Sequence, residues 1–241
     1  MSLYIGRNTT DRLECSSSSA TMNDATTVTM MLWVTPYVNV LNCYGMRKDT
    51  NPAGLGTKRL RIISGGGTLN FDGVITRATT NSDVRAADNT VILEKLQCFA
   101  LSYTETDNSK LYYGDLNKPL AESAYTAGYP IVGAGATLSD GDTFWIGNSQ
   151  AASPSTPARS IFCAAMYSVA YLTLKEMRDW QFAPWTKPRG CVGLWNFKQG
   201  ELMASDLSGH GNHLIDVGGV VAAQTDENPL WSKAYEAREF V

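Results

Sequence analysis

The stretch that most restricts the fold of this chain runs from residue 142 to residue 180. It begins with the apolar strand pattern TFWIG (143–147), which is followed by a loop rich in Ser, Pro and Ala (148–159). An apolar run (161–172) then predicts a long strand whose side chains are mostly buried. A chain with two such strands in close succession is expected to consist mainly of β-structure.

A helix start signal follows the second of these strands. Thr173 and Glu176 have the spacing of a capping box, in which each side chain bonds to the backbone of the other residue. One short helix is therefore predicted over 174–180, and Pro184 limits its extension.

Strand patterns also occupy most of the chain before this stretch. Residues 27–35, TVTMMLWVT, carry apolar side chains on both faces, which is typical of an interior strand in a two-layer structure. Residues 64–67, SGGG, predict a hairpin turn, whereas the polar residues 76–89 predict a loop. Further strands are predicted at 37–46, 60–63, 69–75, 91–96, 98–103 and 110–113.

Four patterns occur at wide intervals along the chain: TVTMMLWVTP (27–36), WIGN (145–148), YSVAYLT and EM within 167–177, and DLSGHGNHL (206–214). Together they resemble the laminin-G-like, concanavalin-A-like jelly-roll domains of bacterial surface and phage proteins. Ala164 and Ala165 replace the Gly and Asp of that family's long strand, so a ligand or metal role of this Asp does not carry over. The family's D-x-S-G-x-G-N motif commonly opens the domain, but here it closes the chain, an order associated with phage virion proteins.

The resemblance implies an all-β fold, an antiparallel two-sheet β-sandwich of the concanavalin A-like jelly-roll type with one short helix near 174–180. One jelly-roll domain is expected over 1–241. Within it, residues 190–241 are expected to supply a C-terminal strand segment that completes the sandwich or docks on it.

The charge of the chain argues against a nucleic-acid partner, because the net charge is -3 and the pI is near 5.4. A phosphate-binding patch requires a basic face, and the basic residues between 47 and 61 are interrupted by neutral residues and Asp49. A solvated loop is the favoured interpretation of this cluster, which consists of Arg47, Lys48, Lys58, Arg59 and Arg61.

Cysteine usage and the N-terminus indicate where the protein is made. The odd number of cysteines and the absence of C-x-x-C are typical of a reducing compartment rather than of a disulfide scaffold. The first twenty residues lack the apolar core of a secretion signal, and no run reaches the ~20 apolar residues of a membrane span. Synthesis in a host cytoplasm is expected, with free thiols at Cys15, Cys43, Cys98, Cys163 and Cys191.

Two pairs of carboxylates have the spacing that glycoside hydrolysis on a strand would need. Retaining hydrolysis places two carboxyl groups about 5–5.5 Å apart, which residues i and i+2 of one strand can provide. Glu105 with Asp107 and Asp140 with Asp142 fit this spacing, but both pairs lie in turn-like sequence, where acids usually bond the backbone. No nucleophile-elbow, zinc-protease or P-loop motif is present. No catalytic residue is therefore predicted.

The two histidines, His210 and His213, lie near Asp206 and raise the question of a metal site. The favoured interpretation is a Gly-rich turn closed by the side chains of Asp206 and Asn212, with the histidines on its surface. No calcium-loop pattern occurs, so no metal or cofactor is predicted, and calcium remains an unassigned alternative.

Four tryptophans are candidates for stacking against sugar rings: Trp145, Trp185, Trp195 and Trp231. Large aromatic residues also fill the cores of β-sandwiches, and this second interpretation is favoured. Trp185 lies between Pro184 and Pro188 and is expected to be the most exposed of the four.

The resulting prediction is a non-enzymatic structural, capsid-decoration or surface protein of a bacteriophage virion. Its partners would be other virion proteins and further copies of itself, with surface glycans as additional ligands and neither nucleic acid nor membrane insertion. The alternative is a glycan-binding adhesion module of a virion or cell surface, and a glycoside hydrolase is a distant alternative. Fold alone does not decide among these functions.

Overall fold

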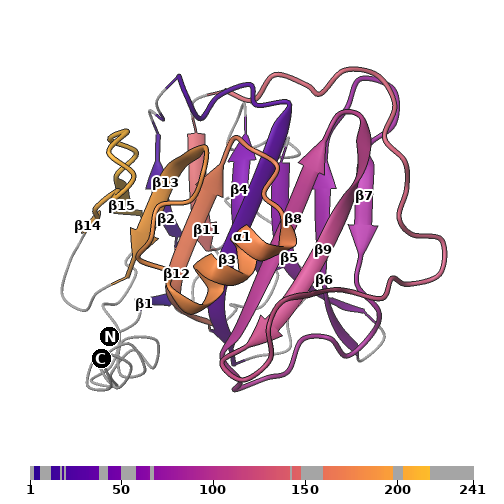
Figure 1. The fold of residues 1–241 in the computed structure, drawn as a ribbon, viewed down its shortest axis with the longest axis horizontal. Helices are drawn as coiled ribbons and strands as arrows, with labels where there is room; N and C mark the ends of the chain where they lie inside the picture. Colours follow the sequence, from indigo (N-terminus) through magenta and orange to yellow (C-terminus); the bar gives the residue numbers. More distant parts are fainter. Residues whose placement is uncertain are drawn as a thin grey trace.

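The computed structural model describes residues 3–5, 12–16, 18, 20–37, 43–49, 58–65, 68–141, 143–147, 160–197 and 203–217. Two antiparallel β-sheets pack face to face, and one short helix lies on the outside of the first sheet (Figure 1). The predicted all-β, two-sheet sandwich with a single short helix is confirmed for the described residues.

The first sheet has the strand order β1-β12-β3-β8-β9-β10, and β13 also pairs with β12. Strand β12 has two partners on one edge, because its first residues pair with β1 and its later residues pair with β13. The strands are β1 (Leu3–Ile5), β3 (Thr27–Pro36), β8 (Gln97–Thr104), β9 (Asp107–Asp115), β10 (Ala121–Glu122), β12 (Ser160–Ser168) and β13 (Cys191–Asn196).

The second sheet has the order β14-β15-β2-β11-β4-β5-β6-β7. Its strands are β2 (Arg12–Cys15), β4 (Cys43–Asp49), β5 (Lys58–Gly65), β6 (Thr68–Ile75), β7 (Ser82–Arg85), β11 (Thr143–Gly147), β14 (Met203–Ala204) and β15 (Leu214–Val217). The part of the chain after residue 190 thus contributes β13 to one sheet and β14 and β15 to the other. A single domain over 1–241 stays a prediction, because 218–241 lie outside the described residues.

Strand β3 shows why the chain needs two apolar layers. Met30 and Leu32 face the core between the sheets, whereas Met31 and Trp33 face the opposite side and pack under helix α1. All four side chains are at most 1% exposed, as the two-faced sequence pattern predicts. The predicted interior strand is confirmed.

The layer under the helix is held by apolar packing and by hydrogen bonds, among them a buried one from the ring of Trp33. Met177 and Trp180 of the helix pack on the same side of the sheet as Trp33. The indole Nε1 of Trp33 donates to the backbone oxygen of Gln181 at 3.0 Å. This bond satisfies the polar atom of a ring that is 0% exposed, which removes the cost of burying it.

Helix α1 (Leu174–Phe182) begins where the capping box predicts and ends two residues later than expected. The backbone N–H of Glu176 donates to Thr173 Oγ1, and the backbone N–H of Thr173 donates to Glu176 Oε2 at 2.7 Å. Arg189 adds an ion pair to the same carboxylate at 3.1 Å. The predicted capping box is confirmed.

This arrangement predicts an acid-sensitive helix start. Hydrogen bonds from Arg189 and from the Thr173 backbone lower the pKa of Glu176 from 4.5 to about 2. A lowered folded-state pKa stabilises the fold at pH values above 4.5, and the contribution is lost as the pH falls toward about 2. Thermal unfolding of wild type and Glu176→Gln should therefore differ at neutral pH and converge in acid. Asp179→Asn, in an exposed pair with Lys175, should show a smaller difference, and a pH-independent Glu176 effect would contradict the assignment.

Two sequence predictions are wrong in the region between β6 and β8. The expected loop 76–89 contains strand β7, and the expected strand 91–96 is a turn segment. The side chain of Gln97 explains the turn, since it accepts from Ile92 N at 2.7 Å and donates to Thr90 O at 3.1 Å. These bonds satisfy backbone groups that a strand would have paired with a neighbour.

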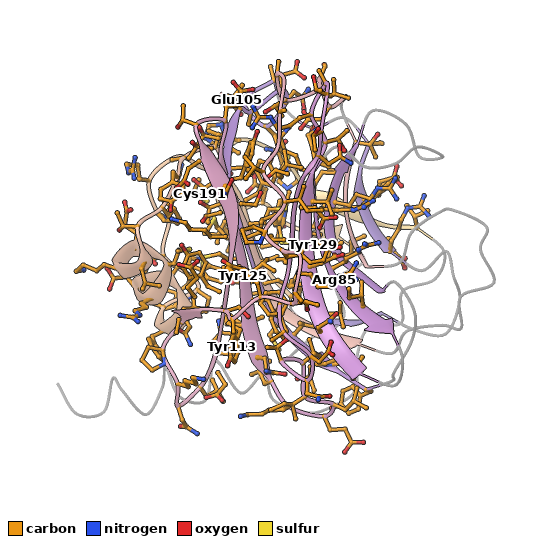
Figure 2. All side chains as sticks on the ribbon, turned by 90° about the vertical axis from the view of Figure 1, so that its right-hand side faces the viewer. Arg85, Glu105, Tyr113, Tyr125, Tyr129 and Cys191 are labelled. Atoms are coloured by element: carbon orange, nitrogen blue, oxygen red, sulfur yellow. The ribbon has the colours of Figure 1, made fainter. Side chains whose placement is uncertain are left out.

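Segment 116–141, for which no prediction was made, closes one side of the sandwich. It contains strand β10 and then runs past β7, where isolated bridges pair Ala86 with Tyr125 and Asp83 with Ile131. Figure 1 shows this segment crossing the side of the molecule where β7 and β9 lie, and Figure 2 looks onto that side.

Candidate functional site

The acids expected at turns bond to the backbone. Glu105 Oε1 accepts from Thr137 N at 2.8 Å, and Asp107 Oδ1 accepts from Asn108 N at 2.8 Å. These backbone hydrogen bonds lower the pKa of both carboxyl groups, whereas a general acid near neutral pH would need a raised pKa. Asp140 does not lie beside Glu105 and Asp107, because it forms a buried ion pair with Lys58. Asp142 lies outside the described residues.

The predicted solvated loop of basic residues is wrong. Lys48 and Lys58 are 0% exposed and Arg47 is 2% exposed, because they belong to the paired strands β4 and β5. Lys58 forms a buried ion pair with Asp140. The guanidinium groups of Arg12 and Arg47 lie 5.5 and 5.0 Å from the ring centroid of Trp145.

The Gly-rich turn 206–214 has the structural role that its sequence predicts. The carboxylate of Asp206 accepts hydrogen bonds from Leu194 N, Ser208 N, Ser208 Oγ and Asn212 N at 2.7–3.1 Å. Asn212 donates to Val192 O at 2.6 Å. These bonds cover the edge of β13 that has no strand partner among the described residues. The same residues contain no group of three or more His, Cys, Asp or Glu side chains that could hold a metal ion.

The tryptophans considered as sugar platforms are mostly core residues. Trp145 is 1% exposed and Trp195 is 0% exposed, and the ring of Trp195 stacks on Phe144 with centroids 5.0 Å apart. Trp185 is partly exposed, and Trp231 lies outside the described residues. The favoured core interpretation is therefore confirmed for Trp145 and Trp195.

A cavity of about 390 Å³ lies where the turn segment 87–96 and the start of β8 meet β9 and segment 116–124. Its walls combine one aromatic ring with charged, amide and hydroxyl groups. Sequence reasoning missed this site, because its residues come from three separate segments that carry no motif. The lining residues with polar side chains are Asp88, Asn89, Thr90, Lys95, Gln97, Tyr113, Asp115 and Lys118.

Tyr113 provides the aromatic wall of the cavity. Its ring packs edge-on against Phe71 of the core, with centroids 6.3 Å apart, and this contact holds the ring in position. The Nζ atom of Lys118 lies 4.5 Å from the Tyr113 ring centroid and 3.3 Å from its hydroxyl oxygen. Figure 2 shows Tyr113 and Tyr125 one above the other on this side of the sandwich.

An ion pair forms a second wall. Lys95 Nζ lies 2.6 Å from Asp115 Oδ2, and Asp115 Oδ1 accepts from the backbone N–H groups of Asn117 and Lys118 at 2.8 Å each. Burial alone would raise the pKa of Asp115, but Lys95 and these two N–H groups outweigh it and lower the pKa. Asp115 is therefore ionised at neutral pH and holds the position of Lys95.

The turn that carries Asp88 and Asn89 is fixed by its neighbours. Asn70 Nδ2 donates to Asp88 Oδ1 at 3.0 Å, and Thr90 Oγ1 donates to Ala87 O at 2.9 Å. Asn89 adopts a left-handed backbone conformation with φ 62°, which Asn tolerates better than most residues. The cavity is thus largely preformed, and its volume lies within the range of about 300–1,000 Å³ found for ligand pockets.

Comparisons with known proteins support the class of fold but do not identify a family. No family model matches the sequence, and no curated protein matches it. A candidate carbohydrate-binding protein from Bacteroides ovatus has a similar structure, with a TM-score of 0.55 and 12% identity over 92% of this chain and 60% of that one. This similarity supports the β-sandwich fold.

Two further structures are more distant. Tailspike protein 2 of bacteriophage CBA120 has a TM-score of 0.48 and 8% identity over 70% of this chain and 25% of that one. A botulinum neurotoxin type C has a TM-score of 0.46 and 12% identity over 75% of this chain and 42% of that one. This chain therefore spans 60% or less of each of these three proteins. None of the described helices is long and apolar enough to cross a membrane.

Proposed function

We propose that this protein is a non-enzymatic carbohydrate-binding module whose ligand occupies the cavity beside Tyr113. The observation that carries the proposal is the combination of a fixed aromatic ring with acid, amide and ammonium groups around one small, preformed cavity. A sugar ring presents an apolar face and an edge of hydroxyl groups, and this combination complements both. The similarity to a candidate carbohydrate-binding protein supports the proposal at the level of the fold.

The charges around the cavity favour an uncharged sugar. Asp88 and Asp115 balance Lys95 and Lys118, so the lining has no net charge. Asp88 and Asn89 are both exposed and can exchange hydrogen bonds with hydroxyl groups. Lys118 is also exposed, so a sugar can displace its ammonium group from the Tyr113 ring and stack in its place.

Location on a phage particle, with capsid or tail proteins as partners, stays a prediction of the sequence resemblance. It is compatible with the proposed activity, because a virion surface protein can bind glycans of the host cell. Mass spectrometry of purified particles would test the location independently of binding.

Binding is tested by a glycan array that includes neutral monosaccharides and bacterial polysaccharides, followed by calorimetry with the strongest ligand. Asp88→Ala and Asn89→Gly should each lower the affinity about tenfold or more, because each removes a hydrogen bond to the ligand. Glycine keeps the left-handed backbone of residue 89, so the second variant isolates the amide group. Asp179→Ala on the exposed side of α1 is the matched control and should leave the affinity unchanged.

The outcomes separate the function from the site. An array without any specific binding would overturn the proposed function. Specific binding that neither cavity variant weakens would keep the function and overturn the site. Turnover of a bound polysaccharide would overturn the non-enzymatic assignment.

A further inference from the structure

A buried ion pair lies where the start of β5 meets the segment before β11. The side chains of Lys58 and Asp140 are both 0% exposed, and Lys58 Nζ is in direct contact with Asp140 Oδ2. Lys58 lies on the same face of β5 as the core residue Leu60, because the two are separated by two positions. Burying an ion pair so completely carries a large desolvation cost before the mutual attraction of the two ions is counted.

The carboxyl group of Asp140 also accepts a hydrogen bond from the backbone, and a second buried lysine lies beside it. Asp24 N donates to Asp140 Oδ1 at 2.6 Å. Lys48 is also 0% exposed, and it donates to Ser18 Oγ at 3.0 Å and to the carbonyl of Gly141, the residue after Asp140. Tyr167 lies near this site: burial and, after it, the charge of Asp140 raise the pKa of its hydroxyl, which has no hydrogen-bond partner among the described residues.

We propose that Lys58 and Asp140 condense to an isopeptide bond, which links the start of β5 covalently to the segment before β11. The inference rests on the direct contact of an amine with a carboxyl group in a site that excludes water. It is independent of the proposed carbohydrate binding.

The condensation converts the ammonium group of Lys58 and the carboxylate of Asp140 into one amide and one water. One proton first passes from the Lys58 ammonium to the Asp140 carboxylate, which gives a neutral amine and a carboxylic acid. The Nζ lone pair attacks Cγ of Asp140 and forms a tetrahedral intermediate with negative charge on one oxygen. The carboxyl hydroxyl leaves with one proton from Nζ, so that one amide and one water are formed and no oxidant is needed.

The surroundings favour each part of this step. Burial raises the pKa of Asp140 against the opposing effect of Lys58, which increases the population of the carboxylic acid. The backbone N–H of Asp24 already donates to Asp140 Oδ1 and can stabilise the oxygen that becomes negative, and the positive charge of Lys48 acts on the same carboxyl group. The product amide is neutral, so condensation also removes two charges from a buried site.

The test is the intact mass of the purified protein together with peptide mapping under denaturing conditions. The chain should be lighter than its sequence by one water, and a digest should contain a branched peptide that joins Lys58 to Asp140. Lys58→Arg retains a positive charge but cannot condense in this way, and it should have the full sequence mass. Lys58→Met is the second variant if arginine does not fit, and it should also have the full mass.

One other reaction removes a water from the same place. The Asp140-Gly141 sequence can form a succinimide, which hydroxylamine opens and which joins no second peptide. A full-length mass for the wild-type chain would overturn the proposal, as would a water loss confined to the peptide with Asp140 and Gly141. A branched peptide that contains Lys48 instead of Lys58 would overturn the assignment of the nucleophile.

Discussion

A chain that ends at Pro188 is expected to have no cooperative unfolding transition and to be largely insoluble. It lacks β13, which pairs with β12, and β15, which pairs with β2, so both sheets lose strands. Val192, Leu194, Trp195 and Phe197 are at most 4% exposed in the complete protein. Burying four such side chains contributes on the order of 6–12 kcal/mol, at about 1.5–3 kcal/mol each.

That contribution is comparable to the entire stability of a typical domain, which is about 5–15 kcal/mol. Circular dichroism during heating would show the loss directly. A chain that ends at Val217 keeps every described strand and is the matched control. A Pro188 truncation as stable as this control would show that β13–β15 are not part of the core.

Asp206→Ala is expected to lower the free energy of unfolding by about 3 kcal/mol or more, because it leaves buried donors without their charged acceptor. The carboxylate accepts from backbone groups of Leu194, Ser208 and Asn212, and Asn212 in turn accepts from Trp195 Nε1 at 2.8 Å. The substitution therefore weakens both the turn and the edge of β13 that it covers.

Denaturant titration measures this loss. Asp206→Asn keeps the size of the side chain and one acceptor oxygen, so its effect should be intermediate. Asp179→Ala removes an exposed carboxylate from α1 and should change stability by less than about 0.5 kcal/mol. A loss of less than about 1 kcal/mol for Asp206→Ala would mean that the turn does not support the strand.

The fold was predictable wherever a short segment carries its own physical requirement. The apolar side chains on both faces of 27–35 require an apolar layer on each side of the strand. The spacing of Thr173 and Glu176 specifies a helix start, and the motif 206–214 supplies the groups that close its own turn. Each of these features depends on residues close together in sequence, and each is present in the structure.

The candidate site was not predictable, because distant segments build it. Nothing near Tyr113 in the sequence indicates that Asp88 and Lys95 share its cavity. Lys58 was predicted to be solvated for the same reason, since its partner Asp140 lies 82 positions further along the chain. The side chain of Gln97 forms hydrogen bonds with the backbone of Thr90 and Ile92 and so holds an apolar segment in a turn that lines the cavity. These hydrogen bonds, too, are visible only in the structure.

The position of β2 in the second sheet has a consequence for biosynthesis. Its neighbours are β11 and β15, and Glu14 pairs with both Trp145 and Ile215. During translation, about two hundred residues must therefore be synthesised after β2 before both of its edges can pair with their neighbouring strands. Such a high contact order predicts slow folding that is completed only after β15 has been synthesised. In the meantime β2 presents two open edges to other nascent chains, and its length of four residues limits that hazard.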